Sequence, residues 1–345
     1  ISFTEETIII DTIPAWPAGG DYAFRDTIYG YSQVPTSMCA VELYIADFGN
    51  HRVLEYALPL DADTTADRVF GQAGSFTTRV ANKGGVSADG EPFFVMEHVD
   101  GRILWQQALP GMTNAERAAI YDEMNRVIAA LHSVDVNAVG LADYGKPGNY
   151  FERQIGRWSK QYLASITEPI AEMDRLIEWL PAHIPTGARD ESQVRVVHGD
   201  FRLDNLVFHK TEPRVIAVLD WELSTLGHPL ADFSYHCMAW HIEPGTFRGI
   251  GGLDHAALGI PGERDYVRRY CERVSRATGH ALDADTVMAD WNFYLAYNLF
   301  RLASITQGIA KRVVDGTAAS AQARATGAAT PALAKMAWRF AQASH

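Results

Sequence analysis

The chain has 345 residues, of which 47% are hydrophobic, and its formal net charge is -12. This length can bury the core of one large two-lobed protein or of two domains. Nucleic acid and an anionic membrane surface would each need a basic face, so the acidic balance argues against both as partners. No apolar run is long enough to span a membrane. The three cysteines lack zinc or disulfide spacing, which predicts reduced thiols and a cytoplasmic location.

Residues 1–90 are expected to be rich in β-structure. Runs of β-forming residues at 42–46 and 52–56 are separated by the turn formers 47–50. The composition changes near Gly90, where helical patterns take over. The sequence therefore predicts a β-rich segment, 1–90, followed by a mainly helical domain, 91–345.

Helical periodicity and capping residues predict most of the second part. Thr113 and Glu116 form a capping box ahead of a helix whose apolar residues recur through Leu131. Further helices are expected at 172–180, ended by Pro181, around Tyr266 and Tyr270 and closed by Gly279, at 286–313, and at 331–343. Short strands are expected at 93–98, 195–197, 206–208 and 215–219.

Polar residues between these short strands carry the chemical signal. In the stretch VHGDFRLDNLVF, residues 197–208, Asp200 and Asn205 share one loop, and Asp220 follows the next strand. Metal-assisted phosphoryl transfer needs a carboxylate that orients the attacking hydroxyl, and hard oxygen ligands for Mg²⁺. We therefore expect Asp200 to be the base and Asn205 and Asp220 to be metal ligands.

His198 to Asn205 and Leu219 to Glu222 resemble the HGDxxxxN loop and the metal motif of the aminoglycoside phosphotransferase family. Residues 221–232 and the helix around Asn298 are similar to the kinase-like domain found joined to acyl-CoA dehydrogenases. The resemblance covers about 91–345 and implies an α+β, protein-kinase-like large helical lobe with a hinge strand. It also implies ATP and Mg²⁺ as cofactors and a small-molecule alcohol as acceptor.

The same resemblance assigns further residues to the site. It places Glu97, His98 and Val99 at the hinge that binds adenine. His198 would support the catalytic loop, and Asp232 would be a buried residue that braces it. Apart from the resemblance, Asp204 is expected to form a salt bridge with Arg202 or to be solvated, while Asp204 and Glu222 could also be extra metal ligands.

The small lobe that a kinase needs is difficult to find ahead of Phe93. Lys83 is the only lysine there, and it lies too close to the hinge strand for an intervening helix with its Glu. Residues 41–89 instead resemble one repeat of an NHL-type β-propeller, which closes only with several blades. The β-rich segment thus stands in place of most of the small lobe.

Three functional hypotheses follow from these observations. The first is an ATP-dependent phosphotransferase acting on a hydroxyl of a small molecule, with a hydroxyacyl compound implied by the resemblance. The second is a non-catalytic, pseudokinase-like binding protein or fusion fragment. The third is a metal-dependent hydrolase using His198, Asp200, Asp220 and Glu222, although a single histidine argues against it. Trp240, Phe247, Trp291 and Tyr294 suggest a partly apolar acceptor, and the oligomeric state cannot be predicted.

Overall fold

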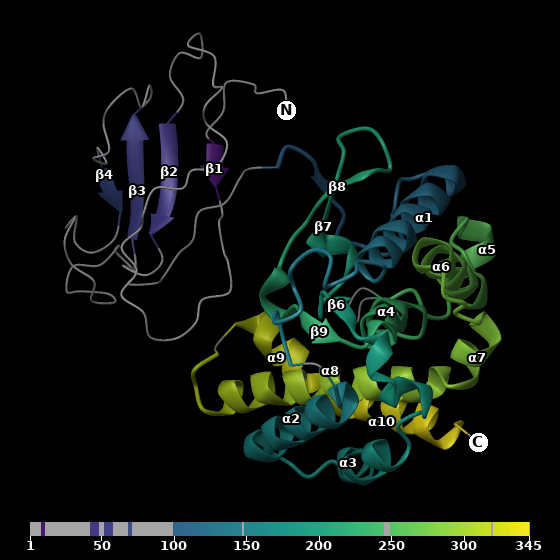
Figure 1. Ribbon diagram of the computed structural model, residues 1–345. Coiled ribbons are helices and arrows are strands. Elements are labelled where there is room, and N and C mark those ends of the chain that lie inside the picture. The colour runs from purple at the N-terminus through teal and green to yellow at the C-terminus, as the bar shows by residue number, and fades with distance from the viewer. Residues whose placement is uncertain are drawn as a thin grey trace. The chain divides into compact units, whose positions relative to one another are not determined.

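The computed structural model describes residues 99–344, except 147, 245–248 and 319, together with the strand residues 8–10, 42–47, 52–57 and 68–70. The chain divides into two compact units, Ile1–Asp100 and Gly101–His345 (Figure 1). The boundary expected near Gly90 and the hinge strand expected at 93–98 lie outside the described residues.

The first unit contains one four-stranded sheet in the order β1-β2-β3-β4. Strand β1 (Ile8–Ile10) pairs in parallel with β2 (Glu42–Asp47). Strand β2 then pairs antiparallel with β3 (Arg52–Ala57), and β3 with β4 (Arg68–Phe70). The strands predicted at 42–46 and 52–56 are confirmed.

The second unit is mainly helical, and its longest helix, α8, forms the centre of its core. Helices α2, α4, α9 and α10 all pack against α8 (Figure 1). The helices are α1 (Asn114–Leu131), α2 (Tyr150–Ser165), α3 (Ala171–Ala182), α4 (Pro229–Cys237), α5 (His255–Leu258), α6 (Glu263–Thr278), α7 (Ala284–Ala289), α8 (Trp291–Val314), α9 (Ala321–Ala328) and α10 (Thr330–Gln342).

Two small sheets hold the polar motif. Strands β5 (Arg102–Ile103), β7 (Leu206–Phe208) and β8 (Val215–Val218) form one antiparallel sheet. Strands β6 (Arg195–Val197) and β9 (Thr225–Gly227) form the other. The strands expected at 195–197 and 206–208 are confirmed, and β8 ends one residue before the predicted Leu219. Strands β5 and β9 were not predicted, because both are very short.

Two helix predictions need correction. The helix expected at 286–313 is interrupted at Asp290, which has φ -97 and ψ 4, so α7 and α8 are separate helices. Pro181 lies inside the last turn of α3 and the helix ends at Ala182. At that position the missing N–H of proline removes a single hydrogen bond, so the turn persists. The capping box of Thr113 and Glu116 is confirmed at the start of α1.

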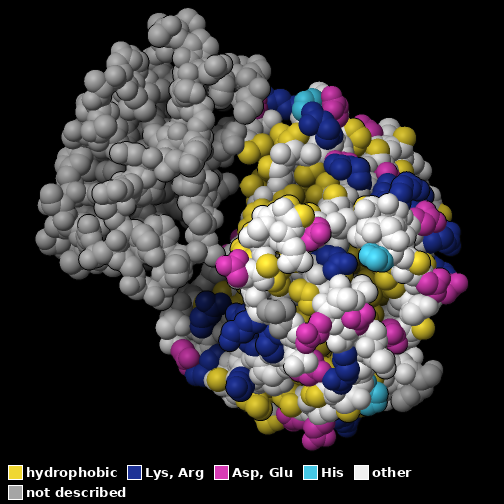
Figure 2. Space-filling model, viewed as in Figure 1, with side chains coloured by type: hydrophobic (Ala, Val, Ile, Leu, Met, Phe, Trp, Pro, Cys, Tyr) yellow, Lys and Arg dark blue, Asp and Glu magenta, His cyan; other side chains and the backbone are white. Residues whose placement is uncertain are grey.

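Aromatic side chains fill much of the core of the second unit. Trp240, Trp291 and Tyr294 are 6%, 3% and 3% exposed, so they are core residues rather than an open acceptor surface, and Phe247 lies outside the described residues. Figure 2 shows basic and acidic side chains interspersed on the visible face of this unit. Among the described residues, no helix is both long and apolar enough to span a membrane.

Candidate functional site

The loop that follows β6 is held by one buried carboxylate. The backbone N–H groups of His198 and Gly199 donate to Asp232 on α4, at 2.7 and 2.9 Å. Nε2 of His132, at the end of α1, lies 3.2 Å from the same carboxylate. Burial alone would raise the pKa of Asp232, but the hydrogen bond and charge of His132 and the contacts with His198 lower it. Asp232 thus braces the loop as an anion, as its resemblance to the family implied.

The ring of His198 supports the same loop. Its Nδ1 accepts a hydrogen bond from the Asp200 backbone N–H at 3.2 Å, and its Nε2 lies 2.8 Å from the Leu219 carbonyl. Because Nδ1 is the acceptor, Nε2 must carry the proton that is donated to Leu219. Both ring nitrogens are engaged in the loop, so His198 has a structural role here and no nitrogen left to bind a metal.

Asp200 and Asn205 lie in direct contact. Nδ2 of Asn205 donates to the Asp200 carbonyl at 2.9 Å and to its Oδ2 at 3.2 Å. Both bonds use the amide nitrogen of Asn205, so Oδ1 of Asn205 remains as the atom that can accept a hydrogen bond or bind a cation. The structure brings together the expected base and the first expected metal ligand.

Asp220 joins the site through the β7–β8 hairpin. The Leu219 N–H donates to the Asn205 carbonyl at 2.8 Å, so the residue before Asp220 is fixed against the first ligand. Asp220 has a φ of 68, in the left-handed region, which aspartate tolerates better than most residues. Its side chain is exposed, and no described residue forms a hydrogen bond or ion pair with it. Carboxylate and amide oxygens both suit a hard cation such as Mg²⁺.

Arg202 adds a positive charge beside the base. Its Nε lies 3.4 Å from Asp200 Oδ2, and a second nitrogen lies 3.2 Å from Asp204, which confirms the expected salt bridge. Burial would lower the pKa of Arg202, but Tyr235, Asp200 and the neighbouring carboxylates raise it. The guanidinium therefore stays charged within the acidic site.

Two residues of the site were missed because they are far from the motif in sequence. The hydroxyl of Tyr235 donates to Oδ1 of Asp200 at 2.5 Å, and burial, with the nearby Asp200 charge, raises the pKa of this phenol. The buried guanidinium of Arg301 donates to the Gly199 carbonyl at 2.5 Å and lies 4.9 Å from the centre of the Tyr235 ring. The available signals were the spacing of Tyr235 three residues after Asp232 on the same helix and, for Arg301, its place in the helix around Asn298.

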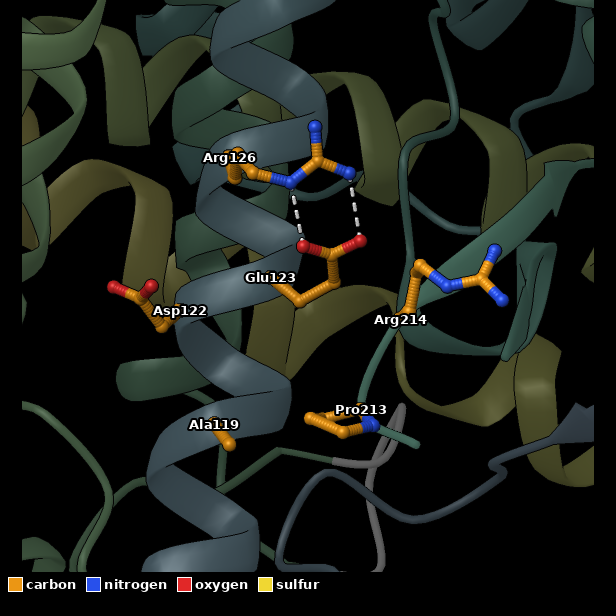
Figure 3. A pocket seen from close by; sticks show the side chains of 6 residues that line it. All are labelled: Ala119, Asp122, Glu123, Arg126, Pro213 and Arg214. Atoms are coloured by element: carbon orange, nitrogen blue, oxygen red, sulfur yellow. Dashed lines mark hydrogen bonds and ion pairs between the residues drawn. The ribbon is translucent and has the colours of Figure 1, made fainter. Parts of the chain in front are cut away.

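A surface pocket between α1 and the β7–β8 hairpin shows how the hairpin is anchored (Figure 3). It has a volume of about 360 Å³ and is lined by Ala119, Asp122, Glu123, Arg126, Pro213 and Arg214. The carboxylate of Glu123 accepts two bonds from Arg126, at 2.6 and 2.7 Å, and one from the Val215 N–H at 2.9 Å. Glu123 thus fixes the start of β8, the strand that leads to Asp220.

The expected adenine contacts cannot be placed in this geometry. Glu97 and His98 lie outside the described residues. Val99 is described and half-buried, and it belongs to the first unit, whose position relative to the second is not determined. The assignment of Glu97, His98 and Val99 to nucleotide binding stays a prediction.

The site combines the expected base Asp200, the amide of Asn205 and a second carboxylate, Asp220. The buried Asp232 holds the loop that carries the first two. A family model described as the phosphotransferase enzyme family matches residues 68–269. The chain belongs to this family. The match confirms the resemblance and begins earlier than the expected start near Glu91, inside the segment 41–89. The NHL-type repeat in that segment stays a prediction.

A crystal structure supports the same phosphotransferase-family assignment. A candidate aminoglycoside phosphotransferase from Ralstonia eutropha is 61% identical, with a TM-score of 0.67 and 74% of each chain covered. This similarity confirms the kinase-like, α+β fold.

Curated relatives match a similar share of the phosphotransferase-family chain. Acyl-CoA dehydrogenase family member 10 of Mus musculus is 44% identical over 255 residues, which cover 73% of this chain and 22% of the relative. Family member 11 of Homo sapiens is 41% identical over 235 residues, which cover 68% and 29%. The chain therefore spans only about a quarter of the length of these two relatives, and it resembles their kinase-like part.

The hydrolase hypothesis finds no support in the described part of this family member. Within it, no group of three or more His, Cys, Asp or Glu side chains is arranged to hold a metal ion. His198, the one histidine of that hypothesis, is bonded through both ring nitrogens.

Proposed function

We propose that the chain is an ATP-dependent phosphotransferase that acts on a hydroxyl group of a small molecule. The observation that supports the proposal is the contact of Asn205 with Asp200, together with the hydrogen bond from the N–H of Leu219, the residue before Asp220, to the Asn205 carbonyl. This geometry supplies one carboxylate for the acceptor and two oxygen ligands for a metal.

In this mechanism Asp200 orients the acceptor hydroxyl and takes its proton while the new O–P bond forms and the bond to the ADP oxygen breaks. Asn205 and Asp220 would hold Mg²⁺, which, with ATP bound, neutralises charge on the phosphates. Arg202 lies close enough to Asp200 to limit the build-up of negative charge in the site. His198 and Asp232 hold the loop in place and do not take part in proton transfer.

The acceptor class rests on the relatives. The curated relatives are acyl-CoA dehydrogenase family members, and the chain matches 22% of one and 29% of the other. A hydroxyacyl compound is therefore the acceptor that we test first. Because the matched share is small, the activity of the whole relatives does not transfer to this chain.

Calorimetric titration with ATP, with and without Mg²⁺, tests the nucleotide site directly. We expect saturable binding that needs Mg²⁺ and that is lost in Asp220→Ala. Asp285→Asn is the control, because it removes an exposed carboxylate on α7, outside the metal motif, and it should keep binding. ATP binding that is independent of Mg²⁺ and of Asp220 would overturn the metal assignment.

Release of ADP from ATP in the presence of hydroxyacyl compounds tests phosphoryl transfer. The same acyl compounds without the hydroxyl group are the controls. Asp200→Asn should keep Mg-ATP binding and lose transfer, because only the proton acceptor is removed.

A non-catalytic binding protein is the second candidate. Lys83 is the only lysine ahead of Phe93, and it lies too close to the expected hinge strand for an intervening helix that could carry the glutamate of a kinase small lobe. Mg-ATP binding without transfer to any hydroxyl compound would favour this candidate.

A further inference from the structure

A second cavity lies in the second unit, where the N-terminal ends of α4 and α8 meet the C-terminal half of α6. We call it the α4–α6–α8 pocket. Its volume is about 370 Å³, within the usual range of small-molecule sites. Its described lining contains none of Asp200, Asn205 and Asp220. The pocket is therefore separate from the proposed phosphotransferase site.

His228 presents an unused hydrogen-bond donor to this pocket. The residue is only 6% exposed, and its Nδ1 accepts the Leu230 N–H at 3.3 Å. Burial lowers the pKa of His228 to about 3, so the ring is neutral and carries its proton on Nε2. No described group accepts that N–H. The ring lies almost parallel to Tyr294, with the ring centres 6.0 Å apart.

Asp290 places an unpaired carboxylate in the same pocket. It is half-buried at the start of α8, and no described residue forms a hydrogen bond or ion pair with its side chain. Asp190, the other lining carboxylate, already accepts the Ser192 N–H at 2.9 Å. Arg195 donates through one nitrogen to two backbone carbonyls instead of pairing with Asp290.

An unpaired, partly desolvated carboxylate costs free energy unless a cation or hydrogen-bond donor meets it. The remaining lining combines apolar side chains, among them Val274, Leu282 and Val287, with polar ones such as Gln193 and Thr278. We propose that the α4–α6–α8 pocket binds a small amphiphilic amine, with its ammonium group on Asp290 and its apolar body against α6 and α7. An oxygen of such a ligand can accept the His228 N–H.

The wall of this pocket is connected to the catalytic loop. His132 lines the pocket, and its Nε2 lies 3.2 Å from Asp232, which holds the N–H groups of His198 and Gly199. A ligand that packs against His132 restricts the motion of His132 and, through Asp232, that of the loop. Occupancy should therefore slow hydrogen exchange of the two loop amides, although the ligand touches neither residue.

The test uses benzylamine, benzyl alcohol and benzoate as probes on the full chain. We expect saturable calorimetric binding of benzylamine, at least about tenfold weaker binding of benzyl alcohol, and the weakest binding of benzoate. Asp290→Asn should abolish the preference for the amine. Asp285→Asn is the matched control, because its side chain is 83% exposed on the neighbouring helix and outside the pocket lining, and it should bind as the unmodified chain does.

Three results would overturn the proposal: no saturable binding of benzylamine, binding unchanged by Asp290→Asn, or a preference for benzoate. Hydrogen exchange of the peptide that contains His198 and Gly199 tests the connection to the loop. Benzylamine should slow this exchange in the unmodified chain and leave it unchanged in Asp290→Asn; binding without slower exchange would reject the connection. Neither measurement depends on phosphotransferase activity, so a failure here is distinct from a failure of the proposed function.

Discussion

The hydroxyl of Tyr235 donates a hydrogen bond to Oδ1 of Asp200, while the Asn205 amide contacts Oδ2 of the same carboxylate. Each oxygen of the expected base is thus held by a different element, one by α4 and the other by the loop after β6. The Arg301 guanidinium, which packs on the Tyr235 ring and binds the Gly199 carbonyl, connects α8 to the same arrangement. Asp200 is therefore oriented by residues from three parts of the chain.

Tyr235→Phe should keep the fold and the Mg-ATP affinity but lower turnover, because Asp200 loses one of the bonds that orient it. A hydrogen bond to a charged group contributes about 1.5–3 kcal/mol. A double-mutant cycle with Asp200→Asn, measured by chemical denaturation, should therefore show coupling of about this size. Tyr144→Phe is the control, because the Tyr144 hydroxyl forms its hydrogen bond with Ser224 and not with Asp200. A cycle of Tyr144→Phe with Asp200→Asn should show no coupling energy. If the changes in unfolding free energy of Tyr235→Phe and Asp200→Asn simply add in the double variant, the hydrogen bond between these residues makes no contribution in solution.

Asp232→Asn should destabilise the second unit strongly at neutral pH. The change places an amide N–H toward the N–H groups that Asp232 binds, and breaking a buried charged network costs about 3–5 kcal/mol. The pKa of Asp232 is below its ordinary value of 3.8, so its contribution is complete above that pH and is lost as the pH falls below it. The difference in unfolding free energy between Asp232→Asn and the parent should therefore shrink as the pH falls below 3.8.

Denaturant unfolding at neutral pH and below pH 3.8 measures this effect of Asp232→Asn. Asp265→Asn, which removes an exposed carboxylate paired with Arg268 on α6, should change stability by less than about 1 kcal/mol. If the difference in unfolding free energy between Asp232→Asn and the parent grows in acid, Asp232 is not ionised in the folded protein.

The sequence predicted the local features of this site well. Asp200 and Asn205, which are in contact, and Asp220, which follows a residue bonded to Asn205, are close in the chain and flanked by short apolar strands. Their placement therefore depends on a few neighbouring turns. The capping box of Thr113 and Glu116 is likewise a local interaction, and the structure confirms it.

The supporting residues His132, Tyr235 and Arg301 were not predicted because their contacts join distant segments. His132 lies 100 residues from Asp232, and Arg301 lies 102 residues from Gly199. Their partners depend on how α1, α4 and α8 pack, which local periodicity does not determine. The break between α7 and α8 was missed for a related reason, because the sequence on both sides of Asp290 favours a helix.

Glu123→Gln should loosen the β7–β8 hairpin, because the neutral amide weakens the bonds to Arg126 (Figure 3) and to the Val215 N–H. We expect a loss of about 1–3 kcal/mol in unfolding free energy and faster hydrogen exchange of the Val215 amide. Asp122→Asn is the matched control on the same helix, because Asp122 pairs with Arg273 of α6 instead. If both variants change hairpin exchange equally, Glu123 is not the anchor.

Stability should fall as the pH drops below neutrality, in part because His236 is buried. The side chain is 3% exposed beside Tyr266, and burial lowers its pKa from 6.5 to about 4. Between these two values the unfolded chain binds a proton that the folded chain does not, so folding becomes less favourable as the pH decreases. One such group contributes about 1.4 kcal/mol per pH unit.

His236→Phe tests this pH dependence, because it keeps an aromatic ring among Phe201, Trp240 and Tyr266 and removes the titrating group. The variant loses the bond to Tyr266, so its stability at neutral pH should also change; the informative quantity is the slope of unfolding free energy against pH. That slope should be shallower in the variant than in the parent, while His280→Gln, at an exposed position, should leave it unchanged. Equal slopes in parent and His236→Phe would mean that His236 gains its proton without unfolding, and that the site around Phe201 admits water.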